Sequence, residues 1–155
     1  MTRLSEEQCA WLALGVPGAV ATLSGTSQPT IARVFAVRAS EDRKCLEFSI
    51  ARSDAHRTLG NVSQHPLATV TLACPRNYRS LQFKGPCAPL NTGWEDGFFA
   101  DYMSRVAQGM AEIGMHPNDY QRMLGHYTDP TQVVLSLVVE AVFDQTPGPQ
   151  AGRQL

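Results

Sequence analysis

A cluster of basic residues occurs where a predicted strand passes into a predicted helix. Arg52, His56 and Arg57 lie within six positions of one another, and Ser53 lies among them. Ser53 is expected to be the helix N-cap, because a serine hydroxyl can accept a hydrogen bond from an unpaired backbone N–H of the first turn. The positive end of the helix dipole and the remaining N–H groups favour an anion there. The cluster therefore indicates either a phosphate-binding site or a solvated basic helix start.

The elements around this cluster follow from the pattern of apolar residues. Residues 45–50 have the composition of a strand, and apolar residues at helical spacing over 55–62 predict the helix that follows. Pro66 ends the helical pattern. The predicted helix therefore begins directly at the end of a strand.

Arg33 is the other candidate for contact with an anionic ligand. Residues 30–38 are predicted to form the second strand of a β-hairpin with 19–23. Both faces of this strand are mostly apolar, so it is expected to be buried on both sides. A guanidinium on an apolar face needs an anionic partner or access to water at the strand edge. The partner is either a ligand or a carboxylate such as Glu47.

The rest of the chain completes an α+β domain. A helix is predicted near the N-terminus, with Ser5 and Gln8 forming a capping box. Further strands are predicted at 67–73, 79–90 and 133–143, and a helical segment at 94–127. Gly85 marks a candidate β-bulge. Six strands, mostly linked by hairpins, predict a closed or partly open antiparallel barrel, because closure removes unpaired sheet edges.

Length and composition predict one domain, assigned to residues 1–143 with 94–127 as a helical insert. The tail, residues 144–155, contains two prolines and two glycines and is predicted to be irregular. A net charge of −1 indicates no general attraction to nucleic acid or membranes. No apolar run is long enough to cross a bilayer, and the N-terminus lacks the basic region of a signal peptide. A cytoplasmic location is therefore expected.

The sequence indicates no metal site and no catalytic triad. The four cysteines lack C-x-x-C spacing. His116 and His126 lack the i, i+4 spacing of two metal ligands on one helix. No histidine is spaced so that a partnership with a serine or cysteine nucleophile could be identified. The sequence therefore leaves any catalytic residue unidentified.

The order and spacing of these motifs resemble the pyridoxamine 5′-phosphate oxidase-like, FMN-binding split-barrel family. The resemblance covers roughly residues 18–90. It rests on the arginine-bearing strand 33–37, on the strand, turn and short helix of 48–59, and on a later strand ending in glycine, 81–85. It implies an α+β fold built on a six-stranded antiparallel split β-barrel with flanking helices. It also implies an FMN site at a homodimer interface.

The resemblance further implies which residues contact the cofactor. Arg33 and Ser53 would hold the FMN phosphate. The family's phosphate-binding lysine corresponds to Ala55 here, so Arg57 or His56 would replace it from the same helix. Five further residues would lie along the isoalloxazine ring or the ribityl chain: Val34, Phe35, Ser49, Ile50 and Gln82.

The function that the resemblance implies is an FMN-dependent oxidoreductase, in which the flavin carries the hydride or electron and the protein orients it. Vitamin B6 synthesis is not implied, because the last residues, 152–155, do not match the arginine- and histidine-bearing C-terminal strand of the true oxidases. One alternative is a non-catalytic flavin- or haem-binding module, with His126 or His116 as axial ligand. Another is a deazaflavin-dependent reductase, although the polybasic loops expected for that cofactor are absent. The sequence does not identify the small-molecule substrate.

Overall fold

The computed structural model describes residues 2–124 and 131–155. In chain order, the elements of the described residues are α1 (Glu6–Leu12), β1 (Gly18–Leu23), β2 (Pro29–Val34), β3 (Val37–Ala39), β4 (Cys45–Ala51), α2 (Arg52–Gln64), β5 (Leu67–Ala73), β6 (Ser80–Pro89), α3 (Phe98–Glu112), α4 (Pro117–Leu124), β7 (Gln132–Val138) and β8 (Ala141–Asp144). None of the helices in this part of the chain combines the length and the apolar character needed to cross a membrane.

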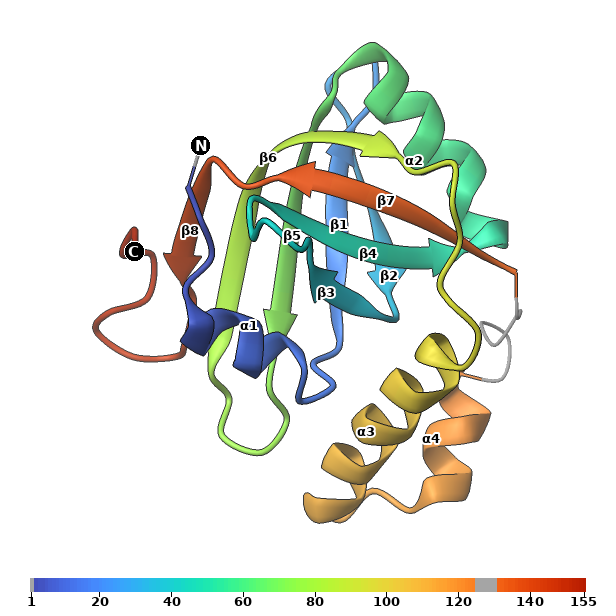
Figure 1. Ribbon diagram of the computed structural model, residues 1–155, viewed down its shortest axis with the longest axis vertical. Coiled ribbons are helices and arrows are strands. Elements are labelled where there is room, and N and C mark those ends of the chain that lie inside the picture. The colour runs from blue at the N-terminus through green and yellow to red at the C-terminus, as the bar shows by residue number, and fades with distance from the viewer. Residues whose placement is uncertain (1, 125–130) are drawn as a thin grey trace.

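The strands form a single antiparallel sheet that curls into a barrel. Their order is β2-β1-β5-β6-β7-β4-β3, with β8 paired to β6. In Figure 1, β4 and β7 cross in front of β1 and β5. The two residues between β2 and β3 bond to β4: the Phe35 N–H donates to the Ser49 carbonyl at 3.0 Å, and the Ser49 N–H donates to the Ala36 carbonyl at 2.9 Å. These bonds link the end of the edge strand β2 to β4, the strand next to the other edge, and so close the sheet. The predicted α+β antiparallel barrel is therefore confirmed.

Two of the six predicted strands are each divided in two, so the described residues form eight strands. The predicted strand 30–38 becomes β2 and β3, and 133–143 becomes β7 and β8. In the first pair, β2 pairs with β1, whereas β3 pairs with β4. In the second pair, β7 pairs with β4 and with the last residues of β6, whereas β8 pairs with an earlier part of β6. The prediction of six strands was wrong, because a change of neighbour interrupts the hydrogen-bond ladder while the apolar pattern in the sequence continues.

β6 turns a barrel corner without interruption, at Gly85. Before this residue β6 pairs with β8, and after it β6 pairs with β7. A Cβ atom at Gly85 would lie 1.9 Å from the backbone oxygen of Val138. Because that atom belongs to the backbone, it cannot move aside as a side chain could. Glycine is therefore required for β6 to pass this close to the end of β7.

Side chains that point into the barrel form the core, and one outer face remains uncovered by the described chain. Phe48 of β4 and Phe83 of β6 are completely buried. On the outside of β2, β1 and β5, Ile31 is 76% exposed, Leu67 59% and Leu23 47%. The prediction that 30–38 is buried on both faces is therefore wrong for β2. The reason is that α2 and the barrel interior cover only one of its faces.

The two ends of the described chain are tied to the barrel. The capping box of α1 is confirmed: the Ser5 hydroxyl accepts from the Gln8 N–H, and the Gln8 side chain accepts from the Ser5 N–H. The tail folds back along β8, where the Asp144 N–H donates to the Arg153 carbonyl and the Leu155 N–H donates to the Val142 carbonyl, both at 2.9 Å. The tail contains no helix or further strand, apart from one isolated bridge.

Tyr102 attaches the helical insert to the N-terminal part of the chain. Its side chain is completely buried. Its hydroxyl donates to the Leu12 carbonyl at 3.0 Å and accepts from the Val16 N–H at 3.0 Å. Burial raises the pKa of Tyr102 well above its usual range, so the group stays a neutral phenol. The two bonds join α3 to the last residue of α1 and to the segment between α1 and β1.

We expect Tyr102→Phe to lower the free energy of unfolding by about 1–3 kcal/mol, because it leaves a buried N–H and a buried carbonyl without their partner. Urea denaturation followed by circular dichroism measures the change. Tyr78→Phe is the matched control, since the Tyr78 side chain is 70% exposed, and it should change stability little. Equal effects of the two substitutions would contradict this account of how the insert is attached.

Candidate functional site

A row of half-buried side chains crosses the outer face of β2, β1, β5 and β6. The register places Arg33 opposite Ala19, Ala19 opposite Thr71, and Thr71 opposite Gln82. We call these four residues, three of which are polar, the outer polar row. Alternate residues of a strand share one face, and their neighbours Val20, Val70 and Leu72 point into the core. Arg33 and Gln82, both assigned to the cofactor from sequence, therefore lie on one surface of the barrel.

Segments from elsewhere in the chain approach both ends of the outer polar row. At one end, the Gln82 amide donates to the Thr71 hydroxyl at 3.0 Å and accepts from the Gln145 amide at 3.4 Å. At the other end, burial raises the pKa of Tyr120 in α4 to about 12, and the nearby Arg33 guanidinium opposes this rise. The helical insert therefore lies near the Arg33 end of the row, and the residues after β8 lie at its Gln82 end.

An apolar region adjoins the outer polar row on the same face. It includes the exposed Ile31, Leu23 and Leu67. A pocket of about 450 Å³ opens here, with Leu23, Pro29 and Leu67 in its wall and Lys84 beside them. This face of the barrel thus offers a polar strip next to an apolar surface.

Arg33 does not pair with Glu47, contrary to one of the options raised by the sequence. Glu47 lies opposite Arg38 in the register of β3 and β4, and its carboxylate accepts from Arg38 Nε at 2.7 Å. The division of the predicted strand at Phe35 puts the two arginines on different stretches of sheet. Within residues 2–124 and 131–155, no carboxylate lies within ion-pair distance of Arg33.

The helix α2 begins two residues earlier than a Ser53 cap would allow, at Arg52 instead of Asp54. Ala51 is both the last residue of β4 and the N-cap, and it makes no side-chain capping bond. Ser53 is therefore inside the helix and exposed, so the prediction of a Ser53 cap is wrong. The physical reason is that the strand runs into the helix with no loop residue between them. The first N–H groups of α2 consequently have no capping side chain.

A pocket of about 210 Å³ lies between the start of α2 and β2. We call it the α2 pocket; its lining residues are Thr30, Ile31, Ala32, Ser53, Asp54, His56, Arg57 and Thr58. It brings together three of the residues predicted to bind phosphate, Ser53, His56 and Arg57. Arg33 follows Ala32 along β2 but does not line the pocket, and Arg52 is exposed outside it. Asp54 is its acidic member, so any bound anion must be compatible with one carboxylate.

Other predicted contacts point away from solvent. Ala55, at the position of the family's lysine, is only 4% exposed and faces the core. Four residues assigned to the isoalloxazine ring have almost no exposed surface in this chain, with relative exposures of 2% or less: Val34, Phe35, Ser49 and Ile50. The Ser49 hydroxyl accepts from the Ala36 N–H at 3.3 Å. Their role in cofactor binding stays a prediction.

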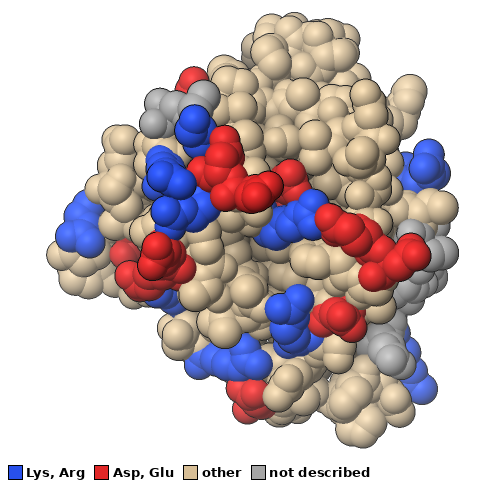
Figure 2. Space-filling view, viewed as in Figure 1, with Lys and Arg blue, Asp and Glu red and all other residues tan. Residues whose placement is uncertain are grey.

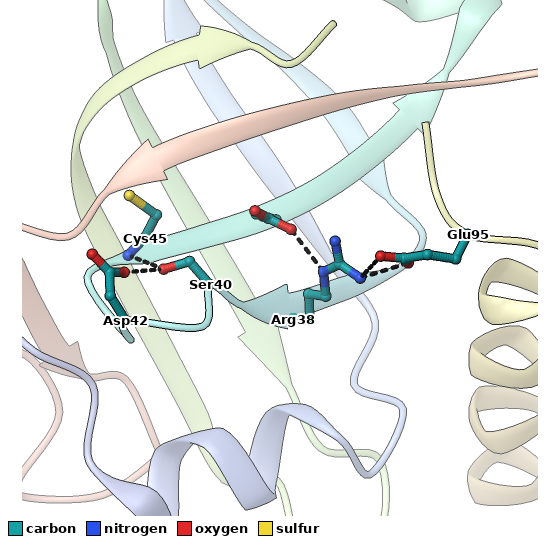
Figure 3. Close-up of polar contacts among 6 residues, drawn as sticks. Arg38, Ser40, Asp42, Cys45 and Glu95 are labelled. Atoms are coloured by element: carbon teal, nitrogen blue, oxygen red, sulfur yellow. Dashed lines mark hydrogen bonds and ion pairs between the residues drawn. The ribbon is translucent and has the colours of Figure 1, made fainter. Parts of the chain in front are cut away.

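Arg38 is the centre of the most extensive ion-pair group in the described chain. Besides Glu47, it donates from Nη1 to both carboxylate oxygens of Glu95, at 2.7 and 2.6 Å (Figure 3). Its guanidinium carbon lies 5.1 Å from the ring centre of Trp94 and 5.4 Å from that of Phe98. The group attaches the start of the helical insert to β3. Figure 2 shows acidic and basic side chains interleaved on this face, not separated by sign.

The histidines give no metal site in the described residues. No group of three or more histidine, cysteine, aspartate or glutamate side chains there could hold an ion. His116 is exposed, and its Nδ1 accepts from the Asn118 N–H at 3.2 Å at the start of α4. His126 lies outside the described residues.

Sequence analysis missed Thr30, Thr71 and Asn61. Thr30 lines the α2 pocket, Thr71 holds Gln82, and Asn61 contacts Thr30 from the helix. In the sequence, Thr30 and Thr71 are ordinary strand residues, and no local motif distinguishes them. A buried polar residue on the apolar side of a helix, such as Asn61, was the one available signal.

Comparison of the chain with known proteins identifies its fold. No protein-family model and no curated protein matches the sequence. Among solved structures, a candidate pyridoxamine 5′-phosphate oxidase from Lactobacillus delbrueckii has a TM-score of 0.53 and 15% identity, covering 91% of this chain and 93% of that one. An F420 reductase has a TM-score of 0.55 and 17% identity, with coverages of 90% and 98%. The chain has the fold of the pyridoxamine 5′-phosphate oxidase-like split barrels.

A third similar structure has a different role. HutZ, the haem storage protein of Vibrio cholerae, has a TM-score of 0.51 and 14% identity, covering 92% of this chain and 95% of that one. The resemblance drawn from the sequence is thus confirmed for the fold. At these identities the proteins sharing the fold differ in ligand, and the chain's own residues have to indicate which ligand it binds.

We expect Glu95→Gln to destabilise the protein near neutral pH but not in acid. Hydrogen bonding from Arg38 holds the pKa of the Glu95 carboxyl below its ordinary value of 4.5. A carboxyl whose folded pKa is lowered stabilises the fold above its unfolded pKa, and this stabilisation is lost as the pH falls through the folded pKa. The difference in urea midpoint between wild type and variant should therefore shrink between neutral pH and about pH 3.

Glu41→Gln is the control for this titration, because Glu41 is an exposed carboxylate without an ion pair in the described chain. It should show no such pH-dependent difference. A Glu95→Gln effect of the same size at every pH would mean that the charge of Glu95 is not what stabilises this contact.

Proposed function

We propose that this protein binds FMN on the outer face of its barrel and acts as a flavin-dependent oxidoreductase. The observation that carries the proposal is Arg33, which lies on the outer polar row without a carboxylate partner in the described chain. It is next along β2 to the α2 pocket, where Arg57, His56 and Ser53 gather. An arginine on a sheet surface beside a pocket lined by a second arginine is suited to the phosphate of a ligand whose remaining part lies along the strands.

The donor set fits a phosphate monoester. Arg57 supplies a cationic donor, His56 an imidazole ring and Ser53 a hydroxyl, and the start of α2 supplies N–H groups without a capping side chain. Asp54 places one negative charge at the same pocket, which several positive donors have to outweigh. Ala55 faces the core, so Arg57 is the residue that would take the part of the family's lysine.

The rest of the outer face fits the remainder of a flavin. The Gln82 amide is held by Thr71 and by Gln145, so its orientation is fixed before a ligand arrives. The adjoining apolar region would cover an aromatic ring system and exclude water. Bound FMN would supply hydride or electron transfer, while these side chains bind and orient it. The proposal does not extend to vitamin B6 oxidation.

The apolar region also supports a homodimer. Ile31, Leu67 and Leu23 together expose an apolar patch on a face that no element of the described chain covers. A second copy related by a two-fold axis would bury the same patch from both chains. Such a partner would also close the candidate cofactor site from the outside.

A haem- or flavin-binding module without catalysis is the second candidate, favoured by the similarity to HutZ. Of its two proposed axial ligands, His116 is at the surface and engaged at the start of α4. The F420 reductase neighbour supports a deazaflavin as a further option. The absorbance spectrum of the purified protein, and mass spectrometry of the released ligand, distinguish these cofactors. A Soret band without flavin uptake would replace the FMN proposal by the haem one.

We expect Arg33→Ala to weaken FMN binding about ten- to a hundredfold, because it removes a charge-assisted contact to the phosphate. Arg57→Ala should cost less, since Arg57 is exposed and water screens its charge. Riboflavin lacks the phosphate, so wild type and Arg33→Ala should bind it about equally. Fluorescence titration with both flavins measures the affinities.

Arg43→Ala is the matched control for this experiment. Arg43 pairs with Glu6, away from the candidate site, and its removal should leave both flavin affinities unchanged. If folded Arg33→Ala keeps full affinity for FMN, or loses riboflavin to the same extent, Arg33 does not bind the phosphate.

We expect light scattering to give twice the chain mass of 16.9 kDa at micromolar concentration. Ile31→Glu should shift the protein toward monomer, because it places a charge in the centre of the apolar patch. Leu14→Glu is the control: Leu14 is 46% exposed but follows α1, outside the patch. A monomeric wild type would contradict the shared cofactor site.

A further inference from the structure

Three polar side chains form a hydrogen-bonded relay that ends at the α2 pocket. The Asn61 amide nitrogen donates to the Thr22 hydroxyl at 2.9 Å and to the Thr30 hydroxyl at 2.7 Å. The two hydroxyl oxygens are 3.1 Å apart, so one of them donates to the other. Asn61 is 7% exposed and Thr22 3%, whereas Thr30 is half-buried and lines the pocket. The relay thus connects a buried amide to the pocket wall.

The direction of the relay follows from counting hydrogen atoms. Both N–H groups of Asn61 are used, one for each hydroxyl oxygen. The two hydroxyls together have two hydrogens, of which one bridges them. If Thr30 donated to Thr22, the second hydrogen would belong to Thr22, whose hydroxyl has no other acceptor within the described residues. A buried donor without an acceptor is costly. The favoured direction therefore runs from Thr22 to Thr30.

With this direction, Thr30 becomes a hydrogen-bond donor toward the α2 pocket. Its oxygen accepts from Asn61 and from Thr22, which leaves its own O–H as the remaining group to be satisfied. Two donors to one hydroxyl oxygen polarise its O–H bond and strengthen the bond that it donates. The Thr30 O–H therefore needs a hydrogen-bond acceptor, such as an oxygen atom, in the pocket. Within the pocket wall the alternative acceptor is the carboxylate of Asp54.

We propose that Thr30 donates a hydrogen bond to a phosphate oxygen of a phosphomonoester ligand, and that Asn61 is the positioning residue that directs this hydrogen toward it. The inference rests on the proposed function and deepens it. It adds a neutral donor from β2 to the donors from α2, Arg57 among them, so the phosphate would be held from both walls of the pocket. It also makes the site selective for ligand groups that only accept hydrogen bonds, as phosphate oxygens do.

Asn61 gives the sharpest prediction, because its replacement by aspartate reverses the relay. An aspartate carboxylate has no N–H and can only accept. Both threonine hydroxyls would then donate inward to residue 61, and the Thr30 hydrogen would turn away from the pocket. Asn61→Asp should therefore weaken phosphate binding as strongly as loss of the Thr30 hydroxyl, although the side-chain shape is almost unchanged.

The test is fluorescence titration of the full chain with FMN and with riboflavin. Thr30→Val, which keeps the shape and removes the hydroxyl, should weaken FMN binding about ten- to a hundredfold and leave riboflavin binding unchanged. Thr30→Ser should restore wild-type FMN affinity. Thr92→Val is the matched control, since Thr92 is exposed in the loop after β6, and it should change neither affinity. Thermal unfolding of each variant checks that it is folded.

The outcomes separate this inference from the proposed function. If wild type binds FMN and riboflavin equally well, or binds neither, the phosphate pocket and the inference are both wrong. If wild type prefers FMN but folded Thr30→Val retains that preference, FMN binding stands and the role of Thr30 is wrong. If Thr30→Val loses the preference and Asp54→Asn does so equally, Thr30 serves to orient Asp54 and does not contact the phosphate. Should Asn61→Asp fail to fold, the contrast between Thr30→Val and Thr30→Ser still decides the matter.

Discussion

The structure depends on one constraint: an antiparallel sheet that closes into a barrel must change strand neighbours at its corners. At two of those corners the interstrand hydrogen-bond ladder is interrupted, between β2 and β3 and between β7 and β8. A third is the continuous bend of β6, where Gly85 lies so close to the Val138 carbonyl that no side chain fits. The bonds between Ser49 and the residues at positions 35 and 36 close the barrel at the first corner. Backbone hydrogen bonding at these corners therefore sets where every strand can point its side chains.

Closure also determines where a ligand site can form. The interior holds completely buried side chains such as Phe48 and Phe83. The outer face of β2, β1, β5 and β6 is instead the surface on which Arg33 and Gln82 meet. Because β4 passes into α2 without a loop, the helix start lies against the edge strand β2, and the α2 pocket forms between them. The candidate site is thus a consequence of the barrel corner and not of any single motif.

The two arginines of the predicted strand 30–38 show how the fold assigns similar residues different tasks. Arg38 has two carboxylates and two aromatic rings around it, and it attaches the helical insert to β3. Arg33 lies on the other side of the break, with an uncharged row of residues across the sheet from it. A guanidinium that is already neutralised contributes little to an incoming anion, while one that has no carboxylate partner among the described residues, as Arg33 has none, can contribute a full charge-assisted contact. Arg38 is a structural residue and Arg33 a candidate ligand contact because their neighbours in space differ, although both belong to the same predicted strand.

The sequence by itself determined the α+β class and several local elements, because local periodicity and capping chemistry specify such elements. These are the hairpin of the first two strands, the capping box of α1, the helix that follows β4 and the helical insert. Motif order was enough to identify the fold. The basic cluster at the start of α2 was also visible, since its members are close in the chain. Only the tertiary structure decided that Ser53 is not the cap, that Glu47 belongs to Arg38, that Ile31 is exposed, and that Asn61 and Thr22 reach Thr30. Each of these depends on which residues distant in sequence become neighbours when the barrel closes, and alternation along one strand does not contain that information.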